Sequence, residues 1–164
     1  MASIPPTDFI SVLKHLNAAT GYLGLGMPLD AWNELEEIDP DKRALPEVLN
    51  VRIEVCRALK KWEMMAEICR HLGKVEPDEV GHPLNLAYAV RRFQGEQPAT
   101  SVLEQARPKF PTEALIPYNL ACYRAVAGMV AEAKTLLAEA FTLDASLRMT
   151  ALDDQDLVGV WDSI

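Results

Sequence analysis

The sequence is poor in several features that mark common protein classes. Of its 164 residues only three are cysteines, a sparse and odd count that cannot build the disulfide framework of a small secreted domain. Basic residues are outnumbered, 16 against 24 acidic ones, which gives a net charge of −8. Nucleic acids and anionic membrane surfaces bind proteins with an excess of lysine and arginine, so the sequence predicts neither of them as a partner.

Long apolar runs are also missing. The longest, residues 125–131, is far shorter than the roughly 18 residues that a membrane-spanning helix needs. No lysine or arginine precedes Lys14, so the basic start of a secretory signal peptide is absent. Together with the few cysteines, these features predict a soluble, cytoplasmic protein with reduced thiols.

What the sequence does contain is a core-forming composition and a period. Its hydrophobic share of 49% predicts a folded chain rather than a disordered one. Prolines recur 34 residues apart, at Pro77 and Pro111 and again at Pro83 and Pro117. The same shift aligns four columns of apolar or small residues: Ala31, Met65, Ala99 and Ala133; Leu35, Cys69, Leu103 and Leu137; Ile38, Leu72, Ala106 and Ala140; and Ala19, Ile53, Ala87 and Ala121. A period kept through four copies predicts a repeat architecture.

Each copy has the apolar spacing of helices. Ala99, Leu103 and Ala106, for example, share one helix face, and no segment alternates with a period of two. Pro108 is expected to end its helix early, and the early Asp39-Pro40 predicts a short second helix in the first copy. The predicted helix pairs are 12–26 with 28–38, 46–59 with 61–75, 82–94 with 98–108, and 113–127 with 130–143.

A 34-residue helix–turn–helix unit with a small residue in its first helix, an alanine in its second and a closing proline resembles the tetratricopeptide repeat (TPR) family. The third and fourth copies match best, whereas the second has Ile53, Lys60 and Met65 at the small positions. The resemblance implies an all-α fold, a right-handed α-solenoid in a single domain over residues 1–164. Its repeats would span about 12–45, 46–79, 80–113 and 114–147, with a C-terminal capping helix in 148–164.

The closing segment has the pattern of such a cap. Asp153 or Asp154 is expected to cap its last short helix. Two apolar sides are predicted for it, one formed by Leu147, Ala151 and Leu152 and the other by Leu157, Val160, Trp161 and Ile164.

No motif for chemistry emerges. Cys56, Cys69, His71 and His82 match no zinc-binding spacing, and Cys69 falls in a core column, which favours buried structural cysteines. The glycine-rich residues 21–26 match neither a dinucleotide-binding fingerprint nor a phosphate-binding loop. The acidic residues 153–156 lack the glycine and distal glutamate of a calcium loop. We therefore predict no catalytic residues, no cofactor, no metal and no enzymatic activity.

The resemblance does imply a binding surface. In TPR proteins the first helices of successive repeats line a concave groove that takes an extended peptide or a helix of a partner. Tyrosine and arginine suit such a surface, because they offer large contact areas and bidentate hydrogen bonds. An alternative is that Tyr88 and Tyr118 pack mainly against each other. Carried over by register, the candidate groove residues are Asn50, Glu54, Arg57, Leu84, Tyr88, Arg91, Tyr118 and Cys122.

These observations predict a non-catalytic adaptor or scaffold that binds a partner protein or peptide through the concave face of its repeats. A cytosolic chaperone for a secreted or aggregation-prone client is the alternative. Acidic residues gather at the end of the first repeat and basic ones in the second, so the chain is expected to be a monomer or a weak homo-oligomer.

Overall fold

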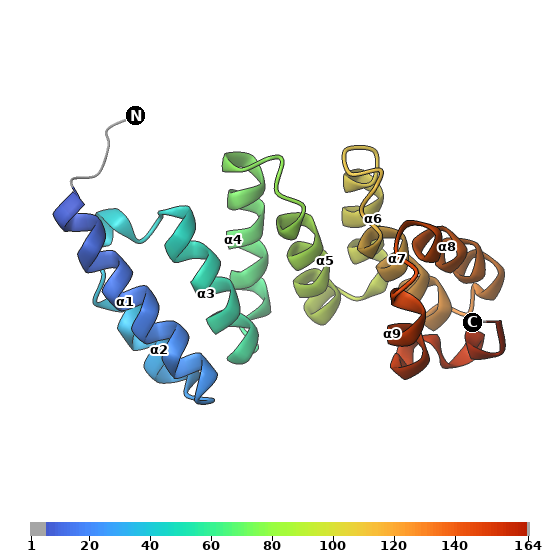
Figure 1. The fold of residues 1–164 in the computed structure, drawn as a ribbon, viewed down its shortest axis with the longest axis horizontal. Helices are drawn as coiled ribbons and strands as arrows, with labels where there is room; N and C mark the ends of the chain where they lie inside the picture. Colours follow the sequence, from blue (N-terminus) through green and yellow to red (C-terminus); the bar gives the residue numbers. More distant parts are fainter. Residues whose placement is uncertain (1–5, 164) are drawn as a thin grey trace. The chain divides into compact units, whose positions relative to one another are not determined.

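The structure is a computed structural model that describes residues 6–163. All regular structure in this range is helical (Figure 1). The helical hairpins are α1 (Pro6–Gly24) with α2 (Pro28–Glu36), α3 (Pro46–Ala58) with α4 (Trp62–Val75), α5 (Gly81–Gln94) with α6 (Glu96–Ala106), and α7 (Leu115–Val126) with α8 (Val130–Leu143). A short 3₁₀ helix, η1 (Pro40–Lys42), follows α2, and α9 (Leu147–Asp153) and the 3₁₀ helix η2 (Gln155–Ser163) follow α8. The predicted helix pairs are confirmed.

The chain divides into two compact units. The described residues up to Glu76 form unit 1 and those from Pro77 onwards form unit 2. The boundary coincides with the closing proline of the second copy, so each unit comprises two of the four predicted repeats. The single domain predicted for the whole chain stays a prediction. Among the described residues, no helix is both long enough and apolar enough to cross a membrane.

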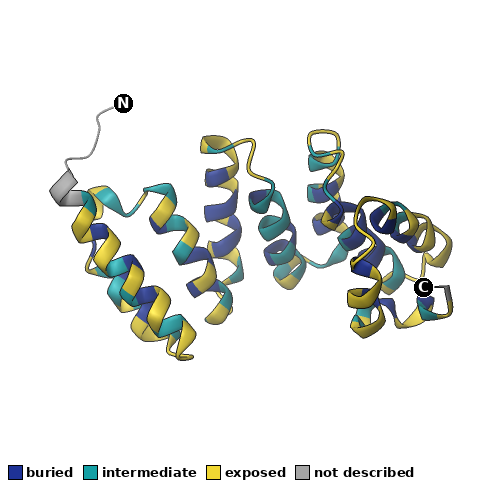
Figure 2. Ribbon diagram, viewed as in Figure 1, coloured by how far each residue is buried: buried dark blue, intermediate teal, exposed yellow. Residues whose placement is uncertain are grey.

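The columns that define the period form the cores of the two units. Of their sixteen residues, fifteen are buried, and only Ala106 is partly exposed. Buried and exposed positions lie on opposite sides of the helices, as Figure 2 shows for α4. Because a helix of this kind cannot bury its apolar side alone, the members of each hairpin pack on one another.

The turns inside the hairpins repeat as well. Gly26, Lys60 and Gly128 lie 34 residues apart, or twice that, and have left-handed φ angles of 71°, 57° and 76°. The next amide in each copy donates to the carbonyl five residues back, as in Met27 N–H to Tyr22 O at 2.9 Å, which is the bond of a Schellman helix end. In the third copy the left-handed residue is Gly95, one position after the register. α6 nevertheless begins at Glu96, 34 residues after the start of α4 and two residues before the predicted start.

The first copy departs from the others as predicted. Its second helix, α2, has nine residues where α4 has 14, and η1 fills part of the longer connection. Arg43 holds this connection against the end of α2, because its Nε donates to Ile38 O at 2.7 Å and its Nη1 contacts Glu36 Oε2 at 2.6 Å. Pro108 ends α6 early, at Ala106, also as predicted. In contrast, α1 begins at Pro6, six residues before the prediction.

Candidate functional site

In unit 1 the candidate groove residues lie on one side of α3. Asn50, Glu54 and Arg57 are four and three residues apart, a spacing that places them on the same helix face. Asn50 and Glu54 are exposed, and Arg57 is half-buried. Arg57 Nε donates to Glu54 Oε2 at 3.2 Å. The α3 face therefore offers an amide and an ion pair to solvent.

In unit 2 the equivalent positions on α5 are Leu84, Tyr88 and Arg91, all half-buried. Arg92 Nη2 donates to the Tyr88 hydroxyl at 3.1 Å, and its guanidinium lies 4.7 Å from the centre of that ring. Tyr88 thus forms a stacked pair with an arginine one turn further along its own helix. Arg91 instead pairs with Asp156, in the C-terminal segment.

On α7 the two candidate residues are covered. The exposed fractions of Tyr118 and Cys122 are 5% and 3%. The Tyr118 hydroxyl donates to Asp154 Oδ2 at 2.9 Å, and the Cys122 thiol donates to the same oxygen at 3.5 Å. What buries them is the chain's own C-terminal segment, residues 147–163, which we call the tail and whose η2 packs against α7.

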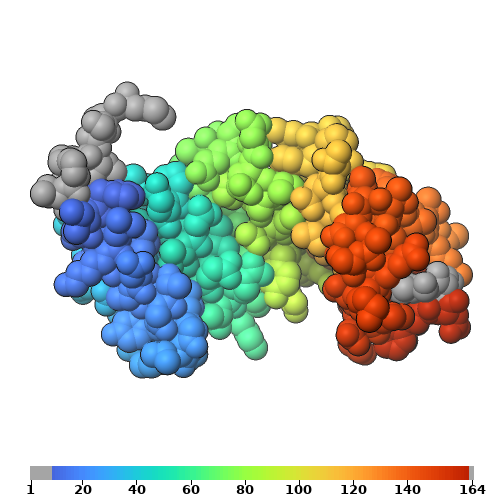
Figure 3. Space-filling view, viewed as in Figure 1, coloured from blue at the N-terminus to red at the C-terminus, as the bar shows by residue number. Residues whose placement is uncertain are grey.

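The tail is anchored by two aliphatic side chains and by its own hydrogen bonds. Leu157 and Val160 are 0% and 1% exposed, and Trp161 Nε1 donates to Ala151 O at 2.9 Å. In the space-filling view the tail forms the orange-red to red surface at the C-terminal end of the chain (Figure 3). On the two predicted apolar sides, Leu147, Ala151, Leu157 and Val160 are buried and Trp161 is half-buried, whereas Leu152 is 48% exposed. Ile164 lies outside the described residues.

Two aspartates of the tail connect it to α5 and α7. The predicted capping role of Asp154 is confirmed, because its Oδ1 accepts from the Asp156 amide at 3.0 Å at the start of η2. Asp156 Oδ2 lies 2.5 Å from Arg91 Nη1. Arg91 Nε also lies 3.5 Å from Glu96 Oε1, and the guanidinium stacks on the Tyr123 ring, 5.0 Å from its centre. We call Arg91, Tyr118, Cys122 and Tyr123 the α5–α7 face.

The protonation states of this face follow from burial and from these bonds. Desolvation raises the pKa of the Tyr118 phenol and of the Cys122 thiol, and their bonds to Asp154 raise both further. Burial also raises the pKa of Tyr123 to about 12. The bond to Asp156 raises the pKa of Arg91 above its ordinary value. At neutral pH the face therefore presents one cation and neutral donors, and its protonated thiol is a poor nucleophile.

The ligand atoms of Cys122, Asp154 and Asp156 lie within 4.8 Å of one another, a grouping that the sequence analysis missed because the thiol and the carboxylates are far apart along the chain. Such atoms could hold a metal ion if the thiol were deprotonated. Here the thiol donates to Asp154, and Arg91 already supplies a positive charge to Asp156. The two carboxylates already accept hydrogen bonds from Cys122 and Arg91, so the site fits a metal cation poorly.

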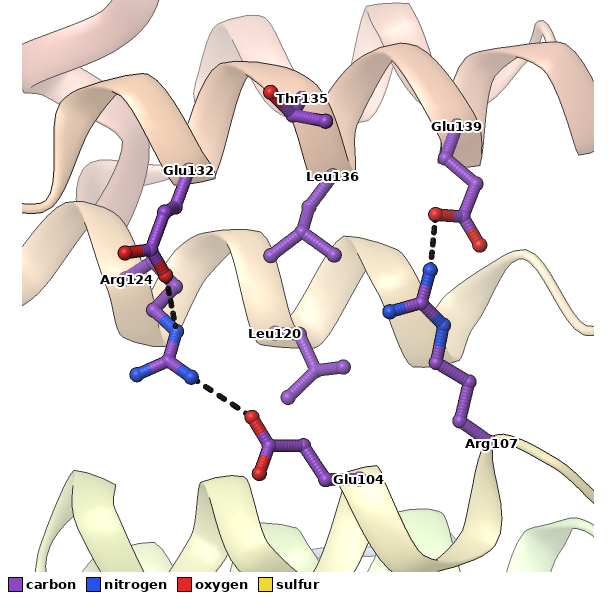
Figure 4. A pocket seen from close by; sticks show the side chains of 8 residues that line it. All are labelled: Glu104, Arg107, Leu120, Arg124, Glu132, Thr135, Leu136 and Glu139. Atoms are coloured by element: carbon purple, nitrogen blue, oxygen red, sulfur yellow. Dashed lines mark hydrogen bonds and ion pairs between the residues drawn. The ribbon is translucent and has the colours of Figure 1, made fainter.

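Unit 2 also has a pocket of about 290 Å³ between α6, α7 and α8 (Figure 4). Its lining residues are Glu104, Arg107, Leu120, Arg124, Glu132, Thr135, Leu136 and Glu139. Arg124 forms ion pairs with Glu104, at 2.8 Å, and with Glu132, at 3.2 Å, and Arg107 pairs with Glu139. Both arginines are thus paired with carboxylates of neighbouring helices, an arrangement that links α6, α7 and α8 rather than one that activates a substrate. The sequence does not predict this pocket, because its lining residues share no motif.

The covering of α7 had a signal in the sequence. Ile116 and Leu120 face the rest of unit 2, while Tyr118 and Cys122 face the tail, so α7 is apolar around most of its circumference and buried on both sides. A helix with this pattern needs cover on all sides, and the apolar positions of residues 147–161 make that segment a candidate to provide it.

Comparison with known proteins shows the fold. No family model and no curated protein sequence matches the chain. Among solved structures it is similar to a double mutant of MamA RS-1 (16% identity, TM-score 0.70, 92% of this chain and 83% of that one). It is also similar to TTC0263, a TPR protein of Thermus thermophilus (20%, 0.69, 92% and 81%), and to MamA 41-end of Desulfovibrio magneticus RS-1 (16%, 0.67, 94% and 89%). The chain therefore has an all-α fold of the TPR solenoid class, as its period of 34 predicts.

Proposed function

We propose that the protein is a non-catalytic adaptor that binds a partner protein or peptide through the first helices of its repeats. One observation carries the proposal. The positions that the TPR resemblance assigns to the groove recur with the period, at Asn50 and Leu84, at Glu54 and Tyr88, and at Arg57 and Arg91. On α3 and α5 these side chains are exposed or half-buried rather than part of a core.

The chemistry of these positions supports protein binding. The Glu54–Arg57 ion pair and the stacked Tyr88–Arg92 pair combine charge with a large planar surface, which suits the recognition of polar and aromatic groups of a partner. Solved structures of the same fold class that are TPR proteins support an interaction scaffold in general. The α5–α7 face and the pocket have their ionisable groups tied in structural pairs, which supports a role without catalysis.

Site-specific photo-crosslinking tests the proposal. A photoreactive benzoylphenylalanine is placed at Glu54 or at Tyr88, and as matched controls at Glu67 on α4 or Gln105 on α6, both exposed on second helices. Each full-length variant is irradiated in native lysate, and cross-linked partners are identified by mass spectrometry. We expect the same folded partner to be captured from Glu54 and Tyr88 and not from the controls.

Two results would contradict the adaptor. Capture from Glu67 or Gln105 alone would move the binding surface to the second helices. Capture restricted to unfolded clients, with suppression of their aggregation, would support the chaperone alternative instead.

A further inference from the structure

The tail occupies the α5–α7 face in the manner of a bound peptide. Two of its carboxylates contact the face, and two aliphatic side chains of the same short stretch, residues 154–160, are buried. Asp154 accepts from Tyr118 and Cys122, Asp156 pairs with Arg91, and Leu157 and Val160 are fully buried. These contacts are made by side chains, so the pattern that the face recognises can be written as a short sequence.

That sequence is two carboxylates separated by one residue, followed by aliphatic residues one and four positions later. The polar groups of the face match its two carboxylates. Arg91 offers a charge-assisted bond to the second carboxylate, and the Tyr118 hydroxyl and the Cys122 thiol both point their protons at the first. No carboxylate of α7 faces them, because α7 contains no acidic residue.

The covered positions are the ones expected to bind a partner. Arg91 is equivalent by register to Arg57, and Tyr118 and Cys122 are equivalent to Asn50 and Glu54. On α3, Asn50 and Glu54 are exposed, whereas on α7 the equivalent residues are covered by the tail. The tail therefore lies where the register places the binding surface of the last repeat.

The attachment of the tail is of a kind that can open. Its contacting part, η2, is a 3₁₀ helix, whose hydrogen-bond geometry is poorer than that of an α-helix. Its outer side is accessible to solvent, since Val158 is 49% exposed. Segments with few buried apolar side chains open at a lower free energy than the unit to which they are attached, and in η2 these are Leu157 and Val160.

Resting on the proposed function, we propose that the α5–α7 face binds a partner segment with the pattern acidic-x-acidic-aliphatic-x-x-aliphatic, and that the tail holds this site in cis until the partner segment displaces it. The partner is thus a protein with an acidic, partly apolar segment. The apparent affinity of the face for this segment is reduced because only the chains with an undocked tail can bind it.

A labelled peptide with the sequence of residues 151–162, ALDDQDLVGVWD, serves as the probe, and fluorescence anisotropy measures its binding to full-length protein. Leu157→Asp with Val160→Asp removes the buried anchors and opens the site. Leu152→Asp with Val158→Asp adds the same charge at positions that are 48% and 49% exposed and is the matched control. We expect the opened variant to bind the probe about tenfold more tightly than the wild type, and the control to bind it like the wild type.

Two further measurements assign the contacts. A probe with both Asp154 and Asp156 replaced by asparagine should bind the opened variant about tenfold more weakly, because it loses charge-assisted bonds. Adding Arg91→Ala to the opened variant should weaken binding of the acidic probe similarly, whereas Arg107→Ala, in the separate pocket, should not. Circular dichroism and a cooperative thermal transition establish that each variant is folded.

If the opened variant fails to fold, Asp154→Asn with Asp156→Asn in the full chain keeps both aliphatic anchors and loosens only the polar contacts. Asp153→Asn with Asp162→Asn, both exposed, is its matched control. We expect tighter binding of the probe by the first pair only.

Three results would overturn the inference. They are a folded, opened variant that binds the probe no more tightly than the wild type, equal binding of the acidic and the amide probes, and a wild-type dimer that dissociates when Asp154 and Asp156 are changed to asparagine. In the last case the site would serve a second copy of the chain. Each would leave cross-linking from Glu54 intact, so failure here is distinguishable from failure of the proposed adaptor.

Discussion

Shortening Leu157 to alanine is expected to expose Cys122 to thiol reagents without unfolding the protein. Leu157 is completely buried in η2, and the same segment covers Cys122, which is 3% exposed. Removing most of a buried leucine costs about 2–5 kcal/mol in a closed core, and we take about 2 kcal/mol because a 3₁₀ segment with an exposed outer side relaxes more easily. At about 1.4 kcal/mol per factor of ten, the fraction of chains with an open tail rises about 30-fold.

The assay is alkylation by iodoacetamide at about pH 8, followed by mass spectrometry of the three cysteine-containing peptides. The rate at Cys122 is expected to rise by the factor calculated above. Cys56 and Cys69, both buried in unit 1, serve as internal references and should keep their wild-type rates. Val158→Ala, on the exposed side of η2, is the matched control and should leave all three rates unchanged.

Two outcomes would refute this reasoning. A Cys122 rate within about threefold of the wild type would mean that Leu157 does not hold the tail over the thiol. An equal rise at all three cysteines would mean that the substitution acts through global unfolding rather than through local opening of the tail.

Three further predictions concern stability. Arg52→Ala should lower the free energy of unfolding measured in urea by about 1–3 kcal/mol, because it leaves Glu36, 2.6 Å away, without this cation and unstacks Trp32; no change would contradict the pairing. Lys60→Gly should raise it by about 1 kcal/mol, seen as a higher melting temperature, because lysine is strained at a φ of 57°. Above about pH 9 the unfolding free energy should fall, by at most about 1.4 kcal/mol per pH unit for each buried thiol, because burial raises the pKa of Cys69 to about 12 and the unfolded thiol loses its proton first. Cys69→Ala should make that fall shallower, and an unchanged slope would refute the assignment.

The helices were predictable because the period repeats a burial pattern. Positions such as Leu35 and Leu103 occupy the same place in each hairpin, so one packing rule applies to every copy. The start of α6, at Glu96 directly after the left-handed Gly95, lies two residues before the predicted one, a local choice that apolar periodicity does not encode. The early start of α1 was missed for a similar reason, since its first residues lie outside the repeat columns.

The candidate site was predictable only in part. Register places Asn50, Glu54 and Tyr88 on the first helices, and the structure leaves them accessible. The register does not reveal that Asp154 contacts Tyr118 and that Asp156 contacts Arg91. These contacts join residues 36 and 65 positions apart, through a segment that does not follow the repeat. Their binding role remains a prediction that the experiments above address.

The tail also limits how such a protein can change in length. It contacts two copies at once, through Arg91 on α5 and through Tyr118 and Cys122 on α7. If a copy were added after α8, its first helix would have to supply the tyrosine and the cysteine, and α7 would have to supply the arginine, before the same ending could close the array. A copy inserted at the boundary between the two units, near Glu76 and Pro77, would leave them untouched. Duplication of a repeat is therefore expected to succeed upstream of α5 and to fail after α8. An engineered repeat array that ends in this tail needs an arginine at the position of Arg91, in the repeat before the last one.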